Sequence, residues 1–252
     1  MPGYPSNKSQ WQPTIPVSQS IYDGTNTTQK APLGTRLEVG DRVFHYCYAT
    51  GSEPRGRVCC ATSPAASMNG ALAACSAATT GATSITFTCG TNVATNQYAE
   101  GYMGISKGTQ GGAVYRIKSH GSWATGATNA VVTLYDPLYK DLGAADELGF
   151  VQNIYDDVGT AATATSFPVC VPMVDVTAGG YFWGQTWGPA APLNVEATAV
   201  GAVVKQGTTG GVVACFGGGT TGPAAAGLPI GKNYDLAGTA GEYTPIFLMI
   251  RP

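Results

Sequence analysis

The fold class follows from one stretch of sequence, Arg42-Val43-Phe44-His45-Tyr46-Cys47-Tyr48-Ala49, which is rich in β-branched and aromatic residues. Such residues favour extended backbone, and a run of them without polar alternation is typical of a strand that is buried on both faces. A second stretch, Ser84–Cys89, alternates polar and apolar residues, and it predicts a strand with Ile85, Phe87 and Cys89 facing inward. Both stretches indicate an all-β chain.

Further strands are predicted along the rest of the chain, where short apolar runs alternate with Gly, Asn, Thr and Pro. They are Gly101–Ser106, Ala113–Ser119, Ala130–Leu134, Gly149–Gln152, Val169–Val174, Gly180–Trp187, Ala199–Lys205, Gly211–Cys215 and Thr244–Ile250. One short helix is predicted over Ala65–Ala74, with Ser63 as its N-cap and Pro64 at its first position. We therefore expect an antiparallel sandwich or barrel-like domain with long Gly/Thr/Ala-rich loops.

Residues 1–32 differ from residues 33–252, which form the β-rich body as one domain or as two small β subdomains. The segment carries five prolines, a density that excludes both helix and ladder pairing and predicts an extended N-terminal arm. The arm also carries apolar and aromatic side chains, which a purely solvated tail does not need. We expect these side chains to lie on a surface, either of the same body or of a neighbouring subunit: Tyr4, Trp11, Ile15, Ile21 and Tyr22.

The composition favours a chain that is buried in an assembly. Charged residues make up 11% of the chain and the net charge is −2, whereas soluble domains contain about 25% charged residues. The basic residues are scattered, so we expect no direct binding to nucleic acid. No apolar stretch is long enough for a transmembrane helix, and Met1–Pro5 does not resemble a signal peptide, so we expect no membrane and synthesis in a cytoplasm.

Catalytic and metal-binding patterns are missing from the sequence. His45 lies within a predicted strand and His120 at a strand end, and both are interpreted as structural histidines. The pairs Asp146-Glu147 and Asp156-Asp157 are adjacent residues, which in a strand point to opposite faces. The seven cysteines lack paired spacing and are interpreted mainly as buried free thiols, although Cys59 or Cys60 with Cys75 or Cys89 leaves room for one bridge. We expect no cofactor, no metal and no enzymatic activity.

The segment Gly180–Pro189 holds four aromatic residues. Strand alternation places Tyr181, Trp183, Gln185 and Trp187 on one face. Three interpretations stay open for this face: core packing, a protein interface or a sugar-binding platform.

Several segments, taken in order, resemble tailed-bacteriophage head-decoration or capsid-associated structural proteins. The resemblance covers most of residues 33–252 but not Cys59–Ala82 or Ala214–Leu228. The matching segments are Leu33–Arg36, Gly40–Tyr46, Ala94–Tyr102, Tyr115–His120, Leu134–Leu138, Tyr181–Pro189 and Gly241–Leu248.

The resemblance implies a virion structural protein that decorates and stabilises the outer capsid surface as a cement protein. Its partners would be the major capsid protein and further copies of the same chain, with a homotrimer favoured at a threefold lattice axis. The alternatives are a carbohydrate- or receptor-binding domain of a tail or fibre, in which Trp183 and Trp187 stack on sugar rings, and a glycan-degrading enzyme that uses a carboxylate pair.

Overall fold

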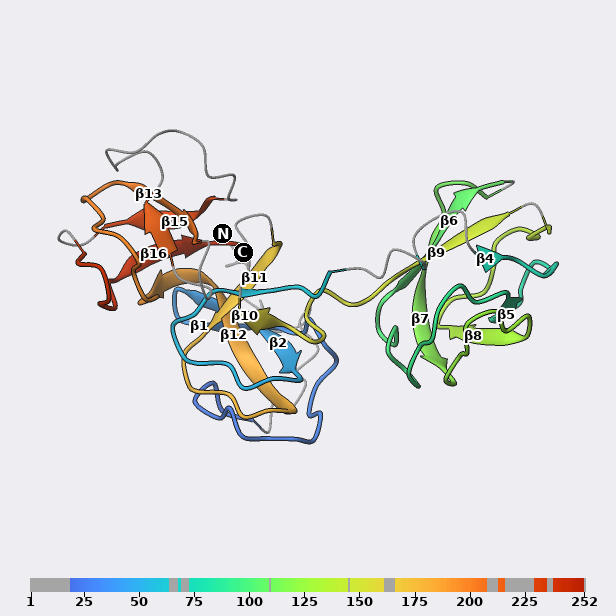
Figure 1. The fold of residues 1–252 in the computed structure, drawn as a ribbon, viewed down its shortest axis with the longest axis horizontal. Helices are drawn as coiled ribbons and strands as arrows, with labels where there is room; N and C mark the ends of the chain where they lie inside the picture. The colour runs from blue at the N-terminus through green and yellow to red at the C-terminus, as the bar shows by residue number, and fades with distance from the viewer. Residues whose placement is uncertain are drawn as a thin grey trace, which may run out of the picture.

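The computed structural model describes residues 19–63, 68, 73–108, 110–144, 146–160, 166–207, 213–215, 229–234 and 238–251. Regular structure within these residues is extended and contains no α-helix, which confirms the all-β class (Figure 1). The strands are β1 (Arg36–Val39), β2 (Arg42–Ala49), β3 (Cys59–Cys60), β4 (Ala73–Ala74), β5 (Ser84–Phe87), β6 (Tyr102–Lys107), β7 (Val114–His120), β8 (Ala130–Leu134), β9 (Glu147–Val151), β10 (Gly159–Thr160), β11 (Pro168–Pro172), β12 (Gly180–Ala190), β13 (Val203–Gln206), β14 (Val213–Cys215), β15 (Pro229–Asn233) and β16 (Ile246–Met249).

The predicted strands are confirmed, β2 and β8 at their predicted bounds and the others with shifted ends. The strands that sequence did not predict are mostly short: β1, β3, β4, β10 and β15. The predicted helix lies largely outside the described residues, and its last two residues, Ala73–Ala74, form β4 instead. None of the described segments is a helix with the length and apolar character that crossing a bilayer requires.

The larger sheet is centred on β12, which pairs antiparallel with β2, β11 and β16. In the β2–β12 ladder, Tyr46 lies opposite Trp183 and Cys47 lies opposite Phe182, so the two pairs face opposite sides of the sheet. All four side chains are buried. The prediction that Arg42–Ala49 is buried on both faces is therefore confirmed.

The smaller sheet has the strand order β4-β9-β6-β7-β8-β5 and comes entirely from residues 73–151, which we call the inserted unit. The chain leaves the larger sheet after β3 and returns at β10, and these two strands pair with each other, Cys60 opposite Gly159. Figure 1 shows the inserted unit, coloured teal to yellow-green, as a body apart from the larger sheet. The unit is thus an insertion between two neighbouring strands.

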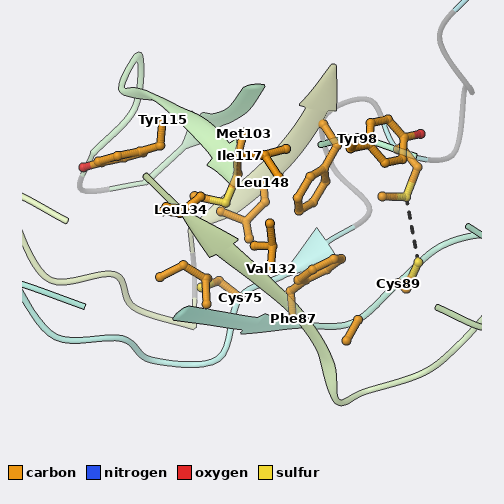
Figure 2. Close-up of a cluster of buried hydrophobic side chains, with 14 of the residues drawn as sticks. Cys75, Phe87, Cys89, Tyr98, Met103, Tyr115, Ile117, Val132, Leu134 and Leu148 are labelled. Atoms are coloured by element: carbon orange, nitrogen blue, oxygen red, sulfur yellow. Dashed lines mark hydrogen bonds between the residues drawn. The ribbon is translucent and has the colours of Figure 1, made fainter. Parts of the chain in front are cut away.

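The inserted unit has its own hydrophobic core (Figure 2). Phe87, Met103, Ile117 and Leu148 come from four strands and are all fully buried. Phe87 also packs its ring edge-on against Trp123, with centroids 4.9 Å apart. Burying each large apolar side chain contributes roughly 1.5–3 kcal/mol, so this cluster stabilises the sheet.

Part of the predicted arm, residues 19–32, lies against the same chain's larger sheet. The Trp183 indole N–H donates to Gln19 O (3.1 Å), and Tyr46 Oη donates to Gln19 Oε1 (2.7 Å). Further along, Asn26 forms an isolated β-bridge with Tyr181, and the side chain of Ala31 is buried. Tyr4, Trp11 and Ile15 lie outside the described residues.

Glu100 connects the inserted unit to this segment. Its carboxylate accepts hydrogen bonds from Leu33 N (2.6 Å) and Gln29 Nε2 (3.2 Å), while its backbone carbonyl accepts from Asn153 Nδ2 (3.2 Å). Glu100 adopts a φ of 60°, a left-handed conformation that is unusual for a residue with a side chain. These contacts hold the side chain of Glu100 at the boundary between the two sheets.

Candidate assembly surface

Trp183 is a core residue. It is 1% exposed, it packs against Phe44 and Tyr46, and its indole N–H is bonded to Gln19. Tyr181 is half-buried, and its ring stacks on that of Tyr46, with centroids 5.9 Å apart. Of the three interpretations of the aromatic strand, core packing therefore holds for Trp183.

Trp187 does not share a face with Trp183, so the prediction of one shared face is wrong. A β-bulge lies between Gln185, which is opposite Phe44, and Trp187, which is opposite Val43. Phe44 and Val43 are successive strand residues and point to opposite sides of the sheet. The extra residue of a bulge shifts the alternation by one. The two tryptophans consequently form no joint platform for a sugar ring.

Ile21 and Tyr22 also differ in their exposure to solvent. Ile21 is partly buried and packs against the cluster around Trp183, whereas Tyr22 is 62% exposed. Only Tyr22 of this pair presents a large free surface to a partner.

His45 is buried in the larger sheet as a neutral ring. Its Nδ1 lies 3.1 Å from Thr186 Oγ1, and its ring stacks on Tyr155 at 5.0 Å with an interplanar angle of 9°. Thr186 Oγ1 donates to Val43 O, so it accepts the Nδ1–H of the histidine. Burial, followed by the nearby charges of Arg251 and Arg36, lowers the pKa of His45 to about 4.

His120 has both ring nitrogens engaged. Its Nε2 accepts the backbone N–H of Tyr98 (2.9 Å) and its Nδ1 donates to Gly121 O (2.6 Å), so the ring is neutral. The ring also stacks on Trp123, with centroids 4.0 Å apart. Burial lowers the pKa of His120. Both histidines therefore have structural partners, in line with their interpretation from sequence.

Six cysteines, Cys47, Cys59, Cys60, Cys75, Cys89 and Cys170, are buried free thiols. Cys47 Sγ and Cys170 Sγ lie 3.7 Å apart, with no disulfide between them. Cys59 and Cys60 belong to the larger sheet, whereas Cys75 and Cys89 pack in the core of the inserted unit. Burial raises the pKa of Cys60 to about 12 and that of Cys75 to about 11, so these thiols stay protonated at neutral pH.

The carboxylate pairs are engaged locally. Asp146 is buried and accepts Gly143 N, whereas Asp156 accepts Gln152 Nε2 (3.0 Å) and burial raises its pKa to about 6. Within the described ranges, no three histidine, cysteine, aspartate or glutamate side chains are grouped so that they could hold a metal ion.

An exposed apolar face on the inserted unit is the strongest candidate for a contact surface, and the sequence did not predict it. We call it the Tyr–Val face. It consists of Tyr102, Gly104, Val114, Arg116, Tyr135, Gly149 and Val151.

The strand register defines this face. Tyr102 lies opposite Arg116 on one side and Val151 on the other, and the next outward row is Val114, Gly104 and Gly149. The row between them, which contains Met103, points into the core instead (Figure 2). Tyr102 is 47% exposed, Val114 63% and Val151 43%. Large apolar side chains thus occupy the solvent side of three neighbouring strands.

Two further features resemble the centre of a protein interface. The Arg116 guanidinium carbon lies 5.4 Å from the centroid of the Tyr135 ring, an arrangement in which cation and aromatic ring attract each other. Tyr and Arg are the residue types that contribute most to binding at interfaces. Gly104 leaves a flat area in the middle, because a Cβ added there meets no heavy atom within 4 Å.

A second candidate surface is a groove of about 550 Å³ beside the end of β12. Its walls include Met173, Gln185, Tyr234 and Tyr243. Both tyrosines are about half exposed, at 53% and 52%. Gly56 allows Tyr243 to lie against the loop, because a Cβ at Gly56 would come within 2.6 Å of that ring.

No protein-family model, no curated protein and no solved structure matches this chain.

Proposed function

We propose that this chain is a virion structural protein that decorates the outer surface of a capsid and stabilises it, as a homo-oligomer bound to the major capsid protein. The Tyr–Val face is the observation that carries the proposal. A monomeric protein gains nothing from exposed tyrosines and valines on three adjacent strands, whereas a subunit of an assembly buries them. The low fraction of charged residues, 11%, supports the same conclusion.

The proposed role needs binding area and rigidity rather than chemistry. A sheet whose opposite side is a packed aromatic core presents its outward side chains with little loss of conformational entropy on binding. Tyr102 and Tyr135 are well suited to such contacts, because each offers a large flat ring with few rotatable bonds. Arg116, held beside Tyr135, adds hydrogen-bond donors to the contact.

The test uses Gly104→Gln, which inserts a neutral side chain into the flat centre of the face. The backbone tolerates the change, because the position has free space above it and is not in the left-handed region. The matched control is Gly143→Gln, another open glycine of the same unit outside the face. The assay is co-sedimentation with shells assembled from the major capsid protein of the same virus, with native mass spectrometry of each free chain for the oligomeric state.

We expect the wild-type chain and Gly143→Gln to sediment with the shells, and Gly104→Gln to bind at least tenfold more weakly with an unchanged melting temperature. Equal binding of both variants would refute the role of the face. A wild-type chain that is monomeric and does not bind shells would refute the function as a whole.

A carbohydrate- or receptor-binding role gives a different result in the same experiment. The wild-type chain would then leave the shells unbound and bind a glycan array, with Tyr102→Ser abolishing the glycan signal.

A further inference from the structure

The groove beside the end of β12 is lined by tyrosine and proline side chains. Its walls combine the exposed rings of Tyr234 and Tyr243 with the side chains of Pro172, Pro189 and Pro245. Grooves lined by aromatic rings bind polyproline II segments, because proline rings pack flat on the aromatic faces while the peptide carbonyls stay free to accept hydrogen bonds. Tyrosine hydroxyls at the rim are donors for such carbonyls.

Residues 19–26 lie on the face of β12 that continues into this groove. Asn26 bridges to Tyr181, while Gln19 donates from Nε2 to Tyr181 O and accepts the indole N–H of Trp183 at its backbone O, so residues 19–26 cover the Tyr181–Trp183 end of β12. Gln185 is the next residue of β12 on that face, and it lines the groove. Tyr181 and Trp183, which Gln19 contacts, are four and two strand residues from Gln185, or about 13 and 7 Å. The chain before Gln19 has to cover that length to reach the groove.

A second contact links the same face to the groove. Met173 packs against the buried cluster that contains Trp183, and it also forms part of the groove wall. The surface over which residues 19–26 run is thus continuous with the groove.

The sequence before Gln19 has the composition that the groove fits. Pro13-Thr14-Ile15-Pro16 is a Pro-x-x-Pro segment that ends three residues before Gln19. A polyproline II chain rises about 3.1 Å per residue, so a Pro13–Pro16 segment in that conformation would extend over roughly 9–19 Å from Gln19, which is long enough to reach the groove. Because the segment belongs to the same chain, its docking loses none of the translational entropy that a separate partner would lose.

We propose that this groove is the binding site of the Pro13–Pro16 segment of the same copy of the chain. The inference does not depend on the proposed function, because it rests on the position of residues 19–26 and on the groove. It assigns Tyr234 and Tyr243 to peptide binding rather than to an external ligand.

The test is photo-crosslinking of the full chain with p-benzoylphenylalanine in place of Tyr243. An equal mixture of 14N- and 15N-labelled chain distinguishes links within one copy from links between copies, and mass spectrometry identifies the linked peptides. Position 139 is the control, because Tyr139 is 66% exposed and lies on the inserted unit. We expect links from position 243 to residues 9–18 of the same copy and none to those residues from position 139.

Proline substitutions sharpen the test. Pro13→Ala with Pro16→Ala should reduce the yield of the link at least fivefold, whereas Pro2→Ala with Pro5→Ala, the other Pro-x-x-Pro pair, should leave it unchanged. The proposal fails if position 243 gives no link to residues 9–18, if the links join different copies, or if only the Pro2 and Pro5 variant lowers the yield. Should the chain labelled at Tyr243 not fold, the label at Tyr234 gives the same readout.

Discussion

His45→Asn should make the larger sheet less sensitive to acid. The folded chain holds His45 neutral, stacked on Tyr155 and bonded to Thr186, with a pKa of about 4 against 6.5 for an unperturbed histidine. Between pH 6.5 and pH 4, His45 is therefore protonated in the unfolded chain but neutral in the folded chain. The stability due to His45 is complete above pH 6.5 and is lost as the pH falls toward 4.

The size of the effect follows from the two pKa values. Between pH 7.5 and pH 5.0, linkage predicts that the free energy of unfolding falls by about 2 kcal/mol through His45 alone. Asp156 acts in the opposite direction, because its raised pKa of about 6 stabilises the folded state as the pH falls through that value. The wild-type curve is therefore shallow, and the difference between wild type and variant isolates the contribution of His45.

The assay is urea unfolding at pH 7.5 and pH 5.0, with amide hydrogen exchange in β2 identifying the sheet that opens. Asn is the replacement because its Nδ2 donates to Thr186 Oγ1 as the histidine Nδ1 does, and Tyr139→Phe, at an exposed position, is the control. The stability advantage of wild type over His45→Asn should shrink by about 2 kcal/mol on acidification. An advantage that changes by less than about 0.5 kcal/mol would refute the reasoning, as would an NMR titration of His45 near pH 6.5.

Three further substitutions test the packing and the charges. Asp156→Asn should raise the free energy of unfolding by about 3 kcal/mol at pH 7.5 and by roughly half as much at pH 5, because below pH 6 the folded carboxyl is protonated while the unfolded one stays ionised down to its ordinary pKa of 3.8; urea unfolding at both pH values measures this. Gly184→Ala should cost about 3 kcal/mol or more, since the new Cβ would lie 2.6 Å from Cys170 Cβ, whereas Gly121→Ala enters open space and should change the urea midpoint little. Glu100→Ala should cost about 1 kcal/mol and speed proteolysis between the two sheets, because the partly buried backbone N–H of Leu33 loses its acceptor; an unchanged cleavage rate would argue against that role.

The fold could be predicted from sequence wherever side-chain alternation or unbroken apolar runs decide the structure. Ser84–Phe87 shows why this works: Ile85 and Phe87 are both buried because successive strand residues face opposite sides. The two-residue strands β3 and β10 could not be predicted, because so short a segment has no period and is defined only by its partner. The insertion of residues 73–151 between β3 and β10 could not be predicted for the same reason.

For the candidate surface, in contrast, most features could not be predicted from the sequence. The prediction about Trp187 failed because one bulge residue reverses the alternation, and nothing in Gly184–Gly188 marks the bulge. Trp183 and Gln19 lie far apart in sequence, so no local sequence pattern indicates their hydrogen bond. The Tyr–Val face had a detectable signal, because Tyr102 and Val151 occupy the polar phase of strands whose other phase is apolar. Recognising it required the strand register, which places those residues side by side.

The pairing of β3 with β10 has a consequence for the order of folding. Cys60 and Gly159 are 99 positions apart in sequence, yet they are neighbours in the ladder. Closing a loop costs free energy that grows with the logarithm of its length, so an inserted unit that folds first and brings its own ends together lowers that cost by about 1–2 kcal/mol. We expect pulse-labelling hydrogen exchange to show protection in β6 and β7 before β3 and β10. A chain emerging from the ribosome would then complete its middle before the sheet that contains β1 and β16.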